Sequence, residues 1–202
     1  MKSFIASSVL AIGILAPAMR AADVSASLAD CNVVWDSPSR DSYDSMPLSG
    51  ARGAGANVWV QDGALWFYPG HSGAQDERGC LLKLGALRIT PEGADFNNPK
   101  RFRQELDLPG GAIRIDAEAQ DGTTLAARLW FAEETLVVEM KFSRDLPVVA
   151  EYGSWRVKPG DPPTAREQVT QQDGMIYVVH RNGRCQRAFD NAKAQSVPEE
   201  AM

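Results

Sequence analysis

The sequence lacks clusters of the residues that bind metals or nucleic acids. It has two histidines and three cysteines in 202 residues, and Cys31, Cys80 and Cys185 are spaced too widely for a zinc-binding pattern. No run of Lys or Arg occurs, and the formal net charge is −5. Phosphate backbones bind clustered cations, so the sequence predicts no metal or other cofactor and no nucleic-acid partner.

The odd number of cysteines leaves the state of their thiols open. All three cannot pair within one chain, although an exported protein meets an oxidising compartment in which two of them can form a disulfide. We interpret them as buried free thiols. The sequence also contains no Asn-x-Ser/Thr site, so nothing indicates a glycosylated surface.

The first 18 residues have the pattern of a signal peptide. Lys2 precedes an apolar stretch over residues 4–16, and Ala16 and Ala18 are small residues of the kind that a signal peptidase requires. The stretch is shorter than the roughly 20 residues that span a bilayer. We expect cleavage of residues 1–18, a short segment over residues 19–30, export to the periplasm or the extracellular space, and no membrane association after cleavage.

Alternation of apolar and polar residues predicts an all-β fold. The alternation runs through residues 102–108, 113–119, 125–131 and 136–142, which is the period of strands with one buried face. Further strands are predicted over residues 57–61, 64–68, 81–90, 148–155 and 175–181. No sustained helical period occurs before Asp190, so we expect residues 31–186 to form an antiparallel β-sandwich. The polar tail over residues 187–202 shows no strand alternation.

A glycine-rich stretch, MPLSGARGAGANVWV over residues 46–60, precedes one of these strands. Its order is Gly-x-x-Gly-x-Gly, no Gly-Lys-Ser/Thr follows, and the next element is a strand. A phosphate site needs its glycines in front of a helix N-terminus, so the context excludes phosphate binding. Two interpretations remain open: a hairpin loop whose glycines take positive φ, or a tight loop that meets another domain.

Candidates for hydrolytic chemistry are few. Asp76 and Glu77 form an adjacent acidic pair near His71 and Arg78, but neighbouring side chains on an extended chain point apart. No Gly-x-Ser-x-Gly motif occurs. A small hydrolase that uses Asp76, Glu77 and His71 is therefore the least favoured function.

For two further groups of residues, both a structural role and a functional role are possible interpretations. His180, followed by Arg181 and Asn182, ends the last predicted strand, and we interpret it as a structural histidine. The five tryptophans can pack in the core, dock a neighbouring domain or stack on sugars; they are Trp35, Trp59, Trp66, Trp130 and Trp155.

Several motifs in register resemble one family. The stretches VVWDSPSRDSYDSMP, GANVWVQDGALWFY, LLKLGALRI, FRQELDL and HRN follow one another over residues 33–182. They are similar to the N-terminal domain of unknown function 5703 of secreted bacterial proteins. In those proteins the domain precedes a glycosidase-like (α/α)6 barrel similar to the fucosidases of glycoside hydrolase family 95. The resemblance implies a super-sandwich-like β-domain that is truncated at its C-terminus in this chain.

The resemblance also implies a function and a set of contact residues. The chain would be a non-catalytic module that docks against a helical barrel, absent from this sequence, and helps to shape its carbohydrate site. Gly50 and Ala51 stand where the family usually has Gly-Asn, so that part of the loop departs from the pattern. The expected docking or binding residues are Met46, Pro47, Gly53, Gly55, Asn57, Trp59, Trp130, His180, Arg181 and Asn182, with Met46, Pro47 and Leu48 exposed. A stand-alone carbohydrate-binding module is the main alternative.

Overall fold

The structure is a computed structural model that describes residues 27–76, 79–155, 167–182, 185–189 and 193–197, with side chains described up to residue 182. The predicted signal peptide, residues 19–26 and Glu77 lie outside the described residues. Among the residues described, no helix is long and apolar enough to cross a membrane.

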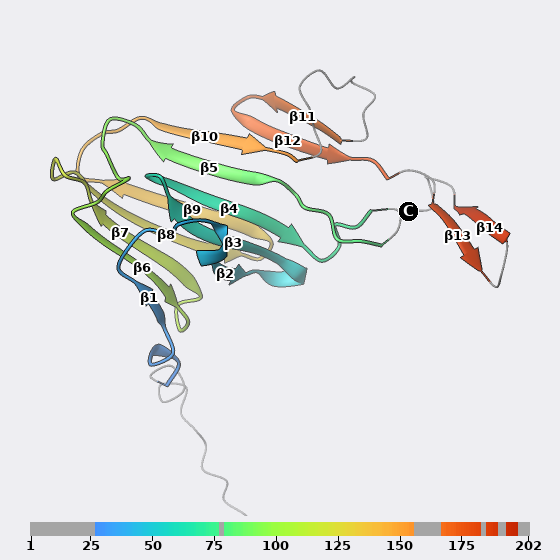
Figure 1. The fold of residues 1–202 in the computed structure, drawn as a ribbon, viewed down its shortest axis with the longest axis horizontal. Helices are drawn as coiled ribbons and strands as arrows, with labels where there is room; N and C mark the ends of the chain where they lie inside the picture. The colour runs from blue at the N-terminus through green and yellow to red at the C-terminus, as the bar shows by residue number, and fades with distance from the viewer. Residues whose placement is uncertain (1–26, 77–78, 156–166, 183–184, 190–192, 198–202) are drawn as a thin grey trace, which may run out of the picture.

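Two five-stranded antiparallel sheets pack face to face (Figure 1). The first sheet has the order β1-β6-β7-β8-β9 and consists of Val33–Trp35, Arg101–Asp107, Ala112–Glu118, Thr124–Ala132 and Thr135–Phe142. The second has the order β10-β5-β4-β3-β2 and consists of Val148–Gly153, Ala86–Pro91, Ala64–His71, Ala54–Gln61 and Met46–Ser49. The prediction of an all-β antiparallel sandwich is confirmed.

The sandwich forms because alternate residues of each strand are apolar and turn inward. In β7, Ile113 and Ile115 are buried, whereas Arg114 and Asp116, which alternate with them, are exposed. Residues of both sheets form one contiguous hydrophobic core in which Phe67 is 1% exposed. An apolar cavity of about 20 Å³ remains between the sheets. Such a cavity holds about one water molecule, so it is too small for a ligand.

Tight turns fix the register of two hairpins. Asp62 and Gly63 connect β3 to β4, and both have positive φ, at 51° and 69°. Asp173 and Gly174 make the same kind of connection in the later hairpin of β11 and β12, at 52° and 74°. Two consecutive positive φ values are those of a type I′ turn, whose twist matches that of the strands, and Asp-Gly is one of its preferred sequences.

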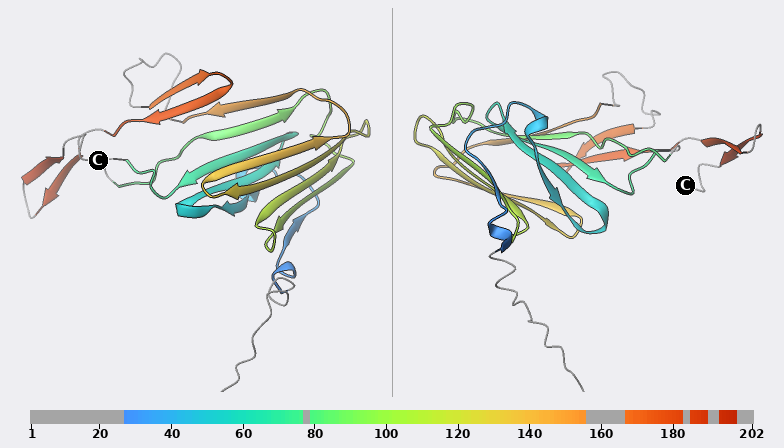
Figure 2. Two further views of the ribbon diagram at one scale, coloured as in Figure 1. Left: turned by 180° about the vertical axis from the view of Figure 1, so that it is seen from behind. Right: turned by 60° about the horizontal axis from the view of Figure 1, so that its bottom comes forward.

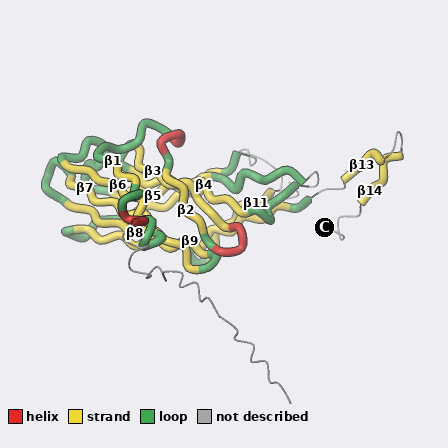
Figure 3. The backbone as a smooth tube through the Cα atoms, turned by 90° about the horizontal axis from the view of Figure 1, so that it is seen from below, coloured by secondary structure: helices red, strands yellow, loops and turns green. Residues whose placement is uncertain are grey.

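Some expected boundaries were wrong. Residues 82–85 are not a strand, because β5 begins at Ala86 and Leu81 forms only an isolated bridge with Gln75. The tail predicted to lack strands contains β14 at Lys193–Val197, which pairs with β13 at Cys185–Phe189. Helical segments are short turns, such as η1 at Ser42–Asp44 and η2 at Ala51–Gly53 (Figure 3).

A separate hairpin follows the second sheet. It consists of β11 at Glu167–Gln172 and β12 at Met175–His180. Within the described part of the chain, these strands pair with each other and with neither large sheet. The hairpin lies beyond β10, outside the sandwich (Figure 2).

Candidate functional site

The glycine-rich loop between β2 and β3 contacts the opposite sheet. The Gly50 N–H donates to the Ala54 carbonyl at 2.9 Å, and the Ala51 N–H donates to the Glu133 carbonyl at 2.8 Å. A Cβ atom on Gly50 would lie 2.5 Å from the Glu133 oxygen and 2.6 Å from the Phe131 ring. The loop therefore holds the second sheet against the β8–β9 turn of the first, and we call this contact the loop clamp.

Gly53 extends the loop clamp to the end of β4. Its φ is +84°, and a Cβ atom there would collide with the Ser72 hydroxyl. The Ser72 N–H donates to the Gly53 carbonyl at 3.0 Å. Beside it, Arg52 lies 3.5 Å from Glu134, and the His71 Nε2 lies 3.9 Å from the same carboxylate. The loop is thus a hairpin loop with a positive-φ glycine, and its close backbone approach serves a contact within the sandwich.

The expectation that residues 46–48 are all exposed was wrong. Met46 and Leu48 are buried, because they lie on the inward face of β2. Pro47 is exposed and lies directly opposite Asn57, which is also exposed. Gly55 pairs with Ser49 at the start of the same ladder. Only the outward half of this predicted docking stretch is therefore accessible.

Aromatic side chains gather on the outward side of the second sheet. Trp59 of β3, Trp66 of β4 and Arg88 of β5 lie directly opposite one another. The two indole rings stack at 5.9 Å with 12° between their planes, and the Arg88 guanidinium lies 5.3 Å from the Trp66 ring. Arg88 also pairs with Glu151 of β10 at 3.5 Å. Four neighbouring strands are thus joined by one row of contacting side chains.

A second row of rings extends this surface. Tyr68 contacts Trp59 edge-on at 4.6 Å and Trp155 edge-on at 5.2 Å. The Lys83 ammonium lies 5.7 Å from the Trp155 ring. Trp59 is 2% exposed, whereas Trp155 is 52% exposed. We call the surface formed by Trp59, Trp66, Tyr68, Trp155, Lys83 and Arg88 the aromatic face.

The outward side of the first sheet has a different character. Trp130 lies there with the Arg128 guanidinium 4.9 Å from its ring, so the structure does not bring Trp130 together with Trp59. Mixed charge is typical of a sheet face that contacts water. The other outward side chains are mostly charged and include Arg103, Glu105, Arg114, Asp116, Arg128, Glu139 and Lys141.

The covered rings limit sugar stacking on the aromatic face. Trp66 stands between Trp59 on β3 and Arg88 on β5, so both sides of its ring are covered. The indole N–H groups of Trp59 and Trp66 both donate to Gln61. Among the four rings, Trp155 offers the large exposed area that stacking on a pyranose requires. The geometry therefore favours a contact surface over an extended sugar platform.

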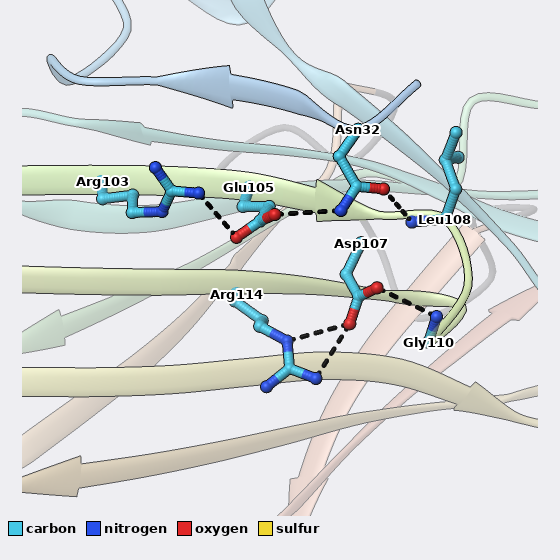
Figure 4. A network of polar contacts seen from close by, with 7 residues as sticks. All are labelled: Asn32, Arg103, Glu105, Asp107, Leu108, Gly110 and Arg114. Carbon is cyan, nitrogen blue, oxygen red and sulfur yellow. Dashed lines mark hydrogen bonds and ion pairs between the residues drawn. The ribbon is translucent and has the colours of Figure 1, made fainter. Parts of the chain in front are cut away.

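A polar network stabilises the open end of the first sheet (Figure 4). Asn32 donates to Glu105 at 2.9 Å and accepts from the Leu108 N–H at 2.9 Å, which ties the segment before β1 to β6. The Asp107 carboxylate accepts from the Gly110 N–H at 3.0 Å and from Arg114 at 2.8 Å. The hydrogen bond from Gly110 and the adjacent Arg114 lower the pKa of Asp107 below its usual value.

This lowered pKa predicts how acid affects the protein. A depressed carboxyl pKa stabilises the fold above the pKa of the unfolded chain, about 4, and the contribution is lost as pH falls through the folded value. We therefore expect Asp107→Asn to destabilise the protein at neutral pH and the difference from wild type to shrink below about pH 4. Urea unfolding at a series of pH values measures this, and a difference that stays constant with pH would contradict it.

Of the three predicted hydrolase residues, the structure describes Asp76 and His71, each in a local contact of its own, whereas Glu77 lies outside the described residues. Asp76 accepts a hydrogen bond from the Cys80 N–H at 2.9 Å and caps its own turn. His71 accepts from the Gly73 N–H at 2.9 Å and faces Glu134. No group of three potential metal ligands occurs among the described residues.

The cysteine interpretation needs a correction. Cys31 and Cys80 are free but exposed, so the expectation of buried thiols was wrong for both. Cys31 precedes β1, and Cys80 lies in the loop after β4. The side chain of Cys185 lies outside the described residues.

His180 belongs to a buried polar cluster at the base of the β11–β12 hairpin. Its Nδ1 lies 3.5 Å from Glu167, which is itself buried and accepts a hydrogen bond from the Ser154 hydroxyl. Asn182 donates to the Gln75 carbonyl at 3.2 Å, whereas Arg181 is exposed. In a hydrolytic triad the imidazole stands between the serine and the acid, but here the carboxylate stands between the serine and the histidine. The cluster anchors the hairpin. No sequence pattern indicated that Glu167 would be part of it.

Comparison with known proteins places this geometry in one family. The comparison with curated proteins finds no match. A family model described as a domain of unknown function (DUF5703) matches residues 34–198, which is most of the chain and includes both sheets and the hairpin. The chain therefore belongs to the DUF5703 domain family.

Proposed function

We propose that this chain is an exported, non-catalytic docking module that binds a helical (α/α)6 domain through its aromatic face and contributes to the rim of that domain's carbohydrate site. The observation that supports this most is the contrast between the two outward sheet faces. One is charged, as a face in contact with water should be. The other carries four aromatic rings between two cations.

The composition of the aromatic face suits a protein partner. Trp, Tyr and Arg are the residues enriched among those that dominate the energy of protein interfaces. Trp59, Trp66 and Arg88 are held by contacts with one another, so little side-chain freedom would be lost on binding. Trp155, at the exposed end of the row, is the side chain best placed to enter a pocket of a partner.

We expect Trp155→Ala to weaken binding to the helical domain of a DUF5703 relative about 30-fold, since an aromatic side chain that fills a pocket of the partner contributes about 2 kcal/mol or more. Isothermal titration calorimetry with the separately produced helical domain measures the dissociation constant. Trp130→Ala removes a tryptophan from the charged outward side of the first sheet. It is the matched control and should leave the dissociation constant unchanged. Equal losses in both variants, or no binding by wild type, would contradict the proposal.

A carbohydrate-binding module is the second candidate, and the exposed ring of Trp155 is what favours it. Glycan-array binding that Trp155→Ala abolishes, together with no binding to the helical domain, would replace the docking role with this one. Turnover of aryl glycosides that Glu77→Gln abolishes would show instead that the chain is an enzyme.

A further inference from the structure

The exposed edges of the two large sheets carry features that hinder the addition of another strand. β2 contains Pro47, β9 contains Glu139 and Lys141, and β10 contains Glu151. β1 is three residues long. Proline, charge and shortness are the usual protections of an edge against pairing with another chain.

β12 has none of these protections. Residues 175–179 read Met-Ile-Tyr-Val-Val without a charge, and their exposed fractions lie between 37% and 53%. Because side chains alternate, Met175, Tyr177 and Val179 lie on one face and Ile176 and Val178 on the other. A strand that is apolar on both faces is typical of the middle of a sheet, yet in the described part of the chain β12 pairs with β11 alone.

We propose that the free edge of β12 is a self-association surface. β12 strands of two copies pair antiparallel around a twofold axis and form a four-stranded sheet of the order β11-β12-β12-β11. In this dimer β12 becomes a central strand, which accounts for its sequence. The sequence of β12 favours a second copy of this chain as the partner. A twofold contact must be self-complementary, and β12 is self-complementary in one particular register.

Symmetry restricts that register. A twofold axis perpendicular to an antiparallel pair keeps each side chain on its own face, and directly opposite residues share a face. The axis must therefore pass midway between two copies of the same residue, one on each strand, which lie directly opposite each other. Tyr177 at the axis brings Ile176 opposite Val178 and Met175 opposite Val179, so apolar side chains meet apolar side chains.

Charge complementarity favours the same register. With Tyr177 at the axis, the β11–β12 turn of each copy, which contains Asp173, lies beside the end of the other copy's β12, which Arg181 follows. An acid and a base therefore come to each end of the four-stranded sheet and oppose the repulsion between copies that each carry a net charge of −5. With Val178 at the axis, Met175 would face Arg181 and Ile176 would face His180, which leaves charged and apolar groups opposed. The dimer is accordingly centred on Tyr177.

Cysteine cross-linking tests the register directly. In a background with Cys31, Cys80 and Cys185 changed to serine, Tyr177→Cys places two thiols on residues that face each other. Their Cα atoms would be about 5 Å apart, within the range that a disulfide bridges. We expect a covalent dimer on mild oxidation. Val178→Cys is the matched control, because its counterpart lies diagonally at about 7–8 Å and should cross-link far less.

A charge substitution tests the surface without oxidation. Tyr177→Lys opposes two ammonium groups at the axis and should weaken the dimer about tenfold or more in sedimentation analysis. Thr170→Lys lies directly opposite Tyr177 within the hairpin but on β11, so this control should still form the dimer. A monomeric wild type at about 100 µM, a dimer that survives Tyr177→Lys, or equal cross-linking by Val178→Cys would overturn the proposal. None of these variants alters the aromatic face, so the result is independent of the proposed docking to a helical domain.

Discussion

Replacing Phe67 with alanine is expected to lower the free energy of unfolding by about 3–5 kcal/mol, the usual cost of removing a fully buried phenylalanine. Phe67 lies at the centre of the second sheet on the inward side, with 1% of its surface exposed. It stands between Val58 on β3 and Leu87 on β5, which pack in the same core. The neighbouring strands on both sides cannot easily move into the space that the phenyl ring leaves, so most of the resulting cavity should remain. Urea or thermal unfolding measures the effect.

Asp116→Ala is the control for this experiment. Asp116 is exposed on the outward side of β7, and surface substitutions usually change stability by about 0.5 kcal/mol or less. Comparable losses in the two variants would mean that the assignment of inward and outward faces is incorrect.

Gly50→Ala is expected to destabilise the protein by about 1–3 kcal/mol, the range for forcing an extra carbon into a packed site. The new Cβ would meet the Glu133 carbonyl at 2.5 Å and the Phe131 ring at 2.6 Å. The carbonyl belongs to the backbone and also accepts the Ala51 N–H. The loop clamp must therefore shift, and hydrogen exchange of the Ala51 amide should accelerate in the variant.

Gly153→Ala is the matched control for the loop clamp. A Cβ atom there has no neighbour within 4 Å, and its φ is not in the left-handed region. Such a change usually has little effect or stabilises slightly, because alanine restricts the unfolded chain. A Gly50→Ala protein as stable as Gly153→Ala would show that the loop does not hold the sheets together.

Strands with one buried and one solvent-exposed face were predictable from the sequence. Contacts between segments that are distant in the sequence were not. β6 to β9 follow directly from alternation, because each has a mostly apolar inward face and an outward face that includes charged residues. β2 was missed since it is four residues long and contains Pro47. Local patterns carry little information about so short a strand.

The candidate site was less predictable than the fold. Alternation within the strand predicted over residues 64–68 puts Trp66 and Tyr68 on the same face. The stacking of Trp66 on Trp59 and its contact with Arg88, however, depend on the register of three strands. Likewise, Gly50 was noticed as a turn residue, whereas its neighbour Glu133 lies far along the chain in the other sheet. Close approach of this kind leaves no periodic signal.

The pairing of β1 with β6 restricts the order in which the chain can fold. Trp35 lies opposite Gln104, so the four strands β2 to β5, which belong to the second sheet, intervene in the sequence. The β3–β4 hairpin closes a two-residue loop, whereas β1 must close a loop that contains most of a sheet, at a much larger entropic cost. During synthesis β1 emerges early and stays without its partner until β6 has left the ribosome. Because β1 is three residues long, it exposes few unpaired backbone groups during this time, which limits misassembly between nascent chains.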